Sequence, residues 1–172
     1  KSPFAEKLAG ECRSPTLYLA TGQPVDSEME ERIRRHRQNR PVAWRTLEAP
    51  LDLASPLKNA LAAEDAPSVV LVDSIDVWVS NLLLDHEDEP VPKLEALALS
   101  HIQMLTELMG QSQAQFFLVS SEVGFSLVSP NALGRRFQDL LGLVNQALAA
   151  AADTVYLVAA GLPMQLKGPD SS

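Results

Sequence analysis

Short apolar runs separated by amphipathic stretches give this chain an alternating pattern. The apolar runs predict strands at residues 16–20, 43–47, 69–72, 116–119 and 155–158, with a short edge strand at 164–166. Apolar residues at helical spacing predict helices at about residues 3–12, 26–38, 55–64, 75–84, 92–110 and 131–152. Strands that are apolar throughout and alternate with helices are typical of a mostly parallel sheet covered on both faces. The pattern therefore predicts an α/β fold.

The last predicted helix has the clearest beginning. Ser129 is the expected N-cap and Pro130 the expected first helical residue, because proline is favoured at that position. An apolar stripe follows on one face, formed by Leu133, Phe137, Leu140, Leu141, Val144 and Leu148.

The composition indicates one domain and excludes several classes of protein. The chain has 172 residues, of which 46% are hydrophobic, and we predict a single domain over 1–167 with a flexible tail at 168–172. The acidic, proline-bearing residues 85–92 predict a solvated loop inside that domain. A net charge of -8 argues against nucleic-acid binding, which needs a broad basic surface.

Cysteine content and hydropathy bear on the compartment. Cys12 is the single cysteine, so the chain can form no internal disulfide, and this favours a reducing compartment such as the cytoplasm. No apolar stretch approaches the ~20 residues that a membrane-spanning helix needs. We therefore expect a cytoplasmic protein with no membrane span.

The first two residues, Lys1 and Ser2, have the form of the end of a phosphate-binding loop, G-x-x-x-x-G-K-[ST]. In a complete loop the lysine reaches the β- and γ-phosphates of a nucleotide, and the hydroxyl binds Mg²⁺. An amphipathic helix follows, as it does after such loops. Because that helix lacks the strand that should precede it, we expect the first strand and the glycine-rich loop to be missing from this chain.

Two acidic residues follow predicted strands. Asp73 ends the run 69–72 and precedes Ser74, which is the form of a Walker-B strand whose carboxylate holds Mg²⁺. Glu122 comes shortly after the strand at 116–119, and ligands bind at the carboxyl ends of strands in open α/β sheets. The alternatives are that Asp73 only begins a turn and that Glu122 only caps a turn or helix.

A basic segment between residues 32 and 45 contains six of the fourteen Lys and Arg residues. In an acidic chain such clustering predicts a site for a triphosphate or another concentrated anion. The neighbouring positive charges favour the neutral form of His36, and a neutral imidazole is a usable nucleophile toward phosphorus. The alternatives are a solvated helix face, paired with Glu28, Glu30 and Glu31, and a surface histidine without a catalytic role.

Taken in order, these segments resemble the bifunctional adenosylcobinamide kinase / adenosylcobinamide-phosphate guanylyltransferase family of cobalamin biosynthesis. The resemblance covers essentially the whole chain. In the first half it rests on Lys1-Ser2, Tyr18-Leu19-Ala20-Thr21, Asp26-Ser27-Glu28-Met29, 32–37, Arg40-Pro41, Trp44-Arg45-Thr46 with Glu48, and Asp73 with 78–83. In the second half it rests on Ser121-Glu122-Val123-Gly124, Val128 with Pro130, 136–139, Gly142, Asn145-Gln146, Ala152-Asp153 and Gly161-Leu162-Pro163.

The resemblance implies a RecA-like P-loop fold, commonly assembled as a homotrimer, with two activities. The first phosphorylates the aminopropanol hydroxyl of adenosylcobinamide with a nucleoside triphosphate, GTP or ATP. The second transfers GMP from GTP to adenosylcobinamide phosphate, through a guanylyl-histidine intermediate, and forms adenosylcobinamide-GDP.

The resemblance also implies roles for individual residues. The guanylylated nucleophile would be His36, and the Mg²⁺ ligands would be Ser2 and Asp73. Nucleotide binding would involve Lys1, Ser2, Arg32, Arg35, Arg37, Glu48 and Glu122. Some relatives carry a histidine pair where this chain has Arg35-His36, so His36 is the only candidate nucleophile in the segment.

Three other hypotheses keep the fold but change the function. The chain could be a RecA-like nucleotide-binding module whose basic segment contacts a partner. It could be an inactive fragment or a non-catalytic subunit. It could also be a kinase without guanylyltransferase activity.

Overall fold

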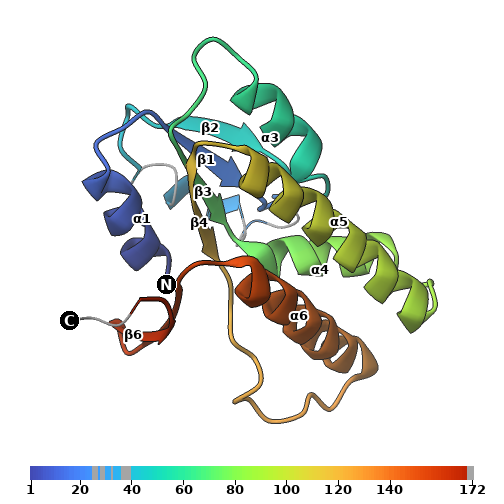
Figure 1. The fold of residues 1–172 in the computed structure, drawn as a ribbon. Helices are drawn as coiled ribbons and strands as arrows, with labels where there is room; N and C mark the ends of the chain where they lie inside the picture. The colour runs from blue at the N-terminus through green and yellow to red at the C-terminus, as the bar shows by residue number, and fades with distance from the viewer. Residues whose placement is uncertain (25–26, 28–29, 32, 36–39, 170–172) are drawn as a thin grey trace.

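A computed structural model describes residues 1–24, 27, 30–31, 33–35 and 40–169 of the chain. Its main sheet has four parallel strands in the order β2-β1-β3-β4. They are β1 (Thr16–Ala20), β2 (Arg45–Glu48), β3 (Val69–Asp73) and β4 (Gln115–Val119). Helices lie on both sides of this sheet (Figure 1), which confirms the predicted α/β, RecA-like architecture.

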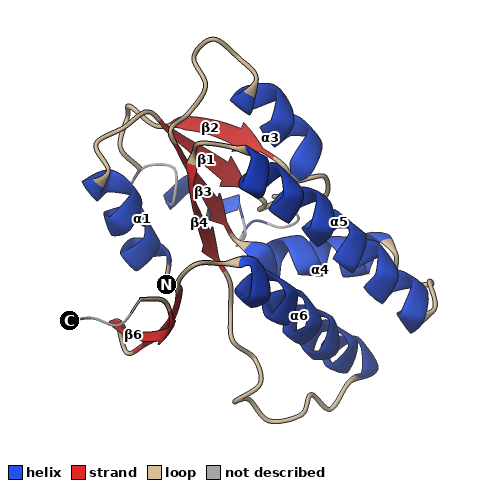
Figure 2. Cartoon of the chain, in the orientation of Figure 1, coloured by secondary structure: helices blue, strands red, loops and turns tan. Residues whose placement is uncertain are grey.

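The two faces of the sheet are covered unequally. On one side lies α1 (Ser2–Glu11), which contacts β3 and β4. The other side carries the remaining helices that the figures label (Figure 2), namely α3 (Ala54–Leu61), α4 (Ile75–Asp85), α5 (Val91–Gln111) and α6 (Ala132–Ala151).

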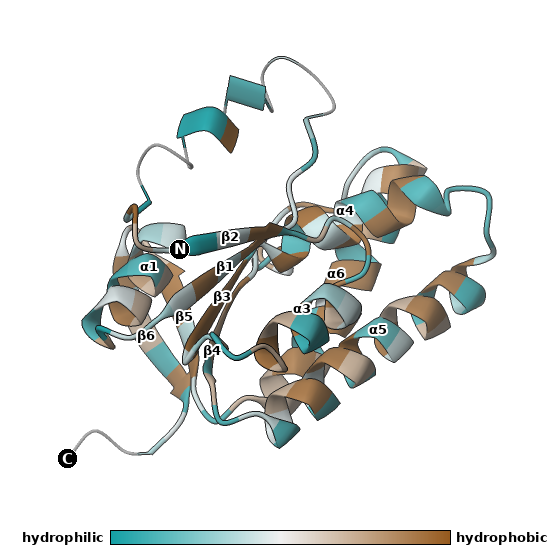
Figure 3. Ribbon diagram, turned by 90° about the horizontal axis from the view of Figure 1, so that it is seen from above, coloured by the Kyte–Doolittle hydropathy of each residue, from teal (hydrophilic) through white to brown (hydrophobic). Residues whose placement is uncertain are grey.

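Alternation along the strands divides the core between these two faces. Leu17 and Leu19 point into the large cluster under the four helices, whereas Tyr18 points to the other side. The large cluster contains the fully buried side chains of Trp78 and Leu141, and Figure 3 shows the apolar strands against the apolar sides of the helices. Burying one such side chain contributes about 1.5–3 kcal/mol, so this face supplies most of the hydrophobic stabilisation.

A second, two-stranded sheet lies beside the first. Strands β5 (Val155–Ala159) and β6 (Leu162–Lys167) pair antiparallel across a turn in which Ala160 and Gly161 have φ of 51° and 81°. Two positive φ values suit a tight hairpin, so β5 pairs with its neighbour in sequence. The interpretation of residues 155–158 as a doubly buried strand was therefore wrong, since Tyr156 is 42% exposed and meets Phe4 of α1 edge-on.

Several predicted boundaries also differ. The N-cap of α6 is Asn131, whose Oδ1 accepts a hydrogen bond from the Gly134 amide at 2.5 Å, so the prediction of Ser129 and Pro130 at the helix start was wrong. The predicted strand at 43–47 begins at Arg45, after a turn. Of the predicted helix 26–38, residues 27, 30–31 and 33–35 are described and are helical. The end of the predicted tail, 170–172, lies outside the described residues.

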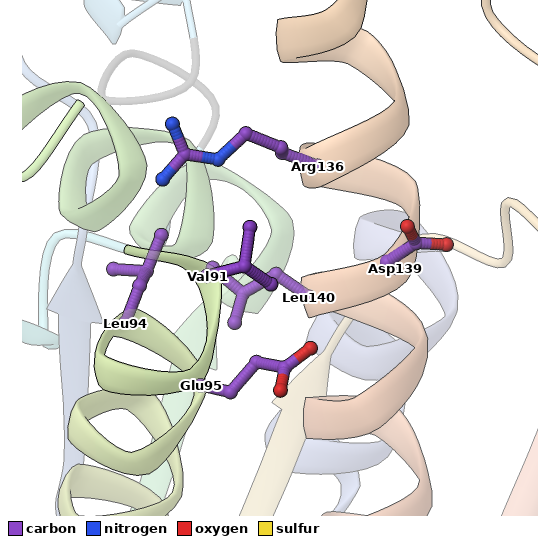
Figure 4. A pocket seen from close by; sticks show the side chains of 6 residues that line it. All are labelled: Val91, Leu94, Glu95, Arg136, Asp139 and Leu140. Carbon is purple, nitrogen blue, oxygen red and sulfur yellow. The ribbon is translucent and has the colours of Figure 1, made fainter. Parts of the chain in front are cut away.

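The acidic loop after α4 is tied to α6 by one arginine. Arg136 donates to the carbonyl oxygens of Glu87 and Glu89, at 2.6 and 2.8 Å. Figure 4 shows its side chain over a cavity of about 40 Å³, which Glu95 and Asp139 also line. A cavity of this size has room for little more than a water molecule, so we assign the junction a structural role.

Candidate functional site

The candidate site lies at the carboxyl edge of the main sheet. The strand register places Glu48, Ala20, Asp73 and Val119 in one row across β2, β1, β3 and β4. The N-terminus of α1 lies at this edge: Ser2 contacts Asp73, the last residue of β3, and Lys1 contacts residues that follow β3 and β4. Open α/β sheets bind their ligands at this edge.

Asp73 is held by two hydroxyl groups. Ser2 Oγ donates to Asp73 Oδ1 at 2.9 Å, and Tyr18 Oη donates to Asp73 Oδ2 at 2.5 Å. Burial first, and then the charge of Asp73, raises the pKa of Tyr18 far above its ordinary value. Tyr18 therefore keeps its proton at neutral pH and acts as a donor that fixes the orientation of the carboxylate.

Arg40 lies over Tyr18. Its guanidinium carbon is 3.3 Å from the centroid of the Tyr18 ring, and its Nη1 donates to Thr46 Oγ1 at 3.3 Å. Contact between a guanidinium and a ring face is attractive because the face is electron-rich. Arg40 therefore connects the end of the basic segment to the tyrosine that holds Asp73.

Lys1 belongs to a second polar cluster at the same edge. Its Nζ donates to Ser121 Oγ and lies 3.7 Å from Asp76 Oδ2. Ser121 Oγ in turn donates to the same Asp76 oxygen. Ser121, just after β4, and Asp76, in the first turn of α4, thus contact the ammonium group of the residue that precedes α1.

The charge of Asp76 is favoured by its surroundings. Burial raises the pKa of Asp76, but hydrogen bonds from Ser121 and Ser74 and the charge of Lys1 outweigh it, and the net shift is downward. The side chain is 22% exposed, and no hydrogen bond of normal geometry reaches its Oδ1 from the described residues. Asp76 is therefore an ionised carboxylate, and its Oδ1 is enclosed by the protein.

Three polar side chains hold the loops around the site, of which Thr21 is fully buried and Asn81 and Asn145 are partly buried. Thr21 Oγ1 donates to the Ser74 carbonyl at 2.8 Å and accepts from the Ser74 amide at 2.9 Å. Asn81 Nδ2 donates to the Thr21 carbonyl at 2.8 Å. Asn145 of α6 donates to the Ser121 carbonyl at 2.8 Å, which fixes the end of β4 where Lys1 arrives.

Much of the predicted basic site lies outside the described residues, namely Arg32, His36 and Arg37. Arg35 is described, and its Nε donates to Glu31 Oε1 at 3.0 Å. Hydrogen bonds from Arg34, and then from Arg35, lower the pKa of Glu31 to about 2. In this structure Arg35 therefore has the pairing of a solvated helix face, and its role in nucleotide binding stays a prediction.

The two remaining predicted residues lie near the edge. Glu48 ends β2 and is exposed. Glu122 Oε1 accepts from the Gly124 amide at 2.5 Å, so its carboxylate closes the turn after β4. In this structure Glu122 therefore caps a turn, as the alternative hypothesis expected. The role of Glu122 in nucleotide binding stays a prediction.

The donor set at Ser2 and Asp73 fits a magnesium ion. Magnesium prefers hard oxygen ligands and is commonly held by one or two protein groups, with water and phosphate oxygens completing its shell. Ser2 supplies a hydroxyl and Asp73 a carboxylate, with 2.9 Å between the two oxygens. In the described part of the chain no group of three His, Cys, Asp or Glu residues could hold a metal ion, and such a group is not needed for this mode of binding.

Several residues of this edge were not predicted as site residues from the sequence. Tyr18 looked like one position of a buried strand, and the chain carries no local sign that it contacts Asp73. Asp76 could have been found, because a second acid three residues after Asp73 falls in the first turn of the following helix. Arg40 carried a signal as well, since it ends the basic segment.

Comparison with known proteins identifies similar chains. The profile of the family described as "Cobinamide kinase / cobinamide phosphate guanyltransferase" matches residues 1–166. The bifunctional adenosylcobalamin biosynthesis protein CobP of Pseudomonas aeruginosa is 40% identical over 168 residues, which are 98% of this chain and 91% of that protein. The proteins of the same description named CobU are 39% identical in Salmonella typhimurium and 38% identical in Escherichia coli, over 97% of this chain and 93% of each relative.

Proposed function

This chain belongs to the cobinamide kinase / cobinamide phosphate guanyltransferase family, and we propose that it carries out both reactions at the carboxyl edge of its main sheet. The kinase reaction phosphorylates adenosylcobinamide with GTP or ATP. The second reaction transfers GMP from GTP to the phosphate so formed and gives adenosylcobinamide-GDP. The observation that carries the proposal is the meeting of Ser2 with Asp73, beside Lys1 and Asp76.

The kinase reaction needs phosphate binding and charge neutralisation. Lys1 offers an ammonium group at the sheet edge, and the dipole of α1 favours an anion near the N-terminus of that helix. Ser2 and Asp73 would hold Mg²⁺, which when bound neutralises charge on the phosphates. Tyr18 and its donated hydrogen bond keep the Asp73 carboxylate turned toward Ser2.

The guanylyl transfer needs a nucleophile, and we propose His36. The imidazole nitrogen forms a bond to the α-phosphorus of GTP as the bond to pyrophosphate breaks. The phosphate of adenosylcobinamide phosphate then forms a bond to the same phosphorus and releases the imidazole. The basic residues around His36, which include Arg35 and Arg40, support a role in holding these negative charges.

Three further features complete the proposal. We propose a homotrimer, which the exposed apolar side chains of Leu162, Met164 and Leu166 on one side of β6 support. A cytoplasmic location is supported by the nucleotide substrates and by the single cysteine.

Among the residues that the structure describes, no helix is long and apolar enough to cross a membrane.

Labelling with GTP tests the nucleophile. Protein incubated with GTP labelled at its α-phosphate should acquire an acid-labile, base-stable label, as expected of a phosphoramidate. His36→Ala should remove the label and abolish GMP transfer, yet keep most of the phosphorylation of cobinamide, because that reaction uses the substrate hydroxyl as nucleophile.

His86→Ala is the matched control. His86 lies in the loop after α4, where its Nδ1 is 3.2 Å from the Leu82 carbonyl oxygen, and we expect its replacement to leave the labelling unchanged. Labelling that survives in His36→Ala would contradict the assignment, as would an equal loss of both activities in a stably folded variant. Absence of label in folded wild-type protein that still phosphorylates cobinamide would support the kinase-only alternative.

A further inference from the structure

A groove opens beside Asp76 on the side of the sheet covered by four helices. Its volume is about 220 Å³, and it lies between the loop after β1, helix α4 and helix α6. The lining residues are Gln23, Asp76, Val77, Ser80, Asn81, Leu84 and Phe137. The groove is separate from the small cavity under Arg136, with which it shares no lining residue.

Asp76 belongs both to this groove and to the cluster around Lys1. Its Oδ2 lies 3.7 Å from Lys1 Nζ, so one end of the groove is next to the ammonium group proposed to bind the nucleotide phosphates. Asp73, in contrast, contacts Ser2 and Tyr18 and does not line the groove. Asp73 and Asp76, the two carboxylates of the β3–α4 junction, thus contact different groups.

The chemistry of the lining indicates what the groove binds. Its walls are apolar at Val77, Leu84 and Phe137 and carry polar groups at Gln23 and Ser80. The ionised Asp76 side chain is 22% exposed and lines the groove, so it can accept a hydrogen bond from a donor bound there. Such a lining suits a short chain that carries an amide, a methyl group and a terminal hydroxyl.

We propose that this groove binds the aminopropanol arm of the cobinamide acceptor, with the hydroxyl at Asp76. The inference rests on the proposed function, because it names the place of that reaction's acceptor. A volume of about 220 Å³ holds the arm but not the corrin ring, which stays outside. In this position the hydroxyl donates a hydrogen bond to Asp76 and lies beside the phosphates bound by Lys1.

The groove can be filled without touching the phosphate cluster. In Ser80→Phe the larger side chain occupies the space, and we expect the KM for cobinamide in the kinase reaction to rise at least about tenfold. The guanylylation of the protein by GTP alone needs no acceptor, so its rate should stay within twofold of the wild-type rate. Ser100→Phe is the matched control, because Ser100 is an exposed serine on helix α5, and both readouts should stay at the wild-type value.

A second variant tests the groove without the risk that a larger side chain impairs folding. Gln23→Ala removes one amide from the groove without adding volume, and we expect a several-fold rise in the KM for cobinamide with unchanged guanylylation. An unchanged KM in both folded variants, or an equal loss of both readouts, would overturn the assignment of the groove. Wild-type protein that fails to phosphorylate cobinamide would instead contradict the proposed function.

Discussion

The two faces of the main sheet differ in what they do for the protein. The face covered by α3, α4, α5 and α6 holds the large apolar cluster, which includes the fully buried Leu141 and Trp78. The face covered by α1 has a small cluster around Tyr18, and here the polar contacts of Asp73 with Ser2 and Tyr18 occur. Most of the hydrophobic stabilisation therefore comes from one face of the strands, whereas the hydroxyl groups that hold Asp73 lie on the other face.

The largest effect should come from the four-helix face. Leu141 is fully buried, so Leu141→Ala should lower the free energy of unfolding by about 2–5 kcal/mol, because it leaves a cavity in a packed core. Urea denaturation measures this loss, and Leu99→Ala at an exposed site on α5 should cost much less. The amount of GTP label per folded molecule should be unchanged. If labelling per folded molecule fell together with stability, the two faces would not have separate roles.

A smaller change in stability, but a large change in activity, is expected at the other face. Asp73→Asn keeps the shape of the side chain and removes its charge, so the Mg²⁺ concentration needed for half-maximal kinase activity should rise at least about tenfold. The free energy of unfolding should fall by under about 1.5 kcal/mol, because the amide oxygen can still accept a hydrogen bond. Asp88→Asn in the exposed loop after α4 is the control, and an unchanged Mg²⁺ dependence in Asp73→Asn would remove Asp73 from the metal site.

The smallest effect on stability should come from the N-terminus of α6, on the four-helix face. Asn131→Ala removes the hydrogen bond to the Gly134 amide and should cost about 1 kcal/mol of stability. Ser129→Ala should cost less, because Ser129 lies before the cap and its backbone amide, not its hydroxyl, bonds Gln138. Thermal unfolding compares the two variants. A larger loss of stability in Ser129→Ala than in Asn131→Ala would support Ser129 as the N-cap, as predicted from sequence.

Sequence patterns predicted a helix or strand well where its formation depends on residues that are close together along the chain. The runs that became β1 and β3 are almost entirely apolar, as expected of strands covered on both faces, and all but the last residue of each is buried. In β4 only Val119 is buried. The same reasoning failed for β5, because a strand of the same composition can pair with its neighbour in a hairpin instead of joining the sheet. The turn at Ala160 and Gly161 decided that pairing.

The candidate site was predictable only in part. Asp73 and Lys1 could be selected because each lies at a recognisable place in a motif, one after a strand and one before a helix. Tyr18 could not be selected, because its contact with Asp73 depends on β1 and β3 pairing in one register. The assignment of His36 depends on family resemblance and local charge, and it stays a prediction for the labelling experiment.

The fold class and several charged groups of the proposed site could be predicted from the sequence alone, and the family was indicated by the resemblance of its ordered segments. These follow from periodicity, composition and short motifs, which are properties of residues close together along the chain. Only the tertiary structure decided that Ser2 and Tyr18 share Asp73, and that Lys1, Ser121 and Asp76 form a separate cluster beside a groove. These contacts join residues far apart in sequence, and they form only when strand order and register bring the carboxyl ends of β3 and β4 against α1.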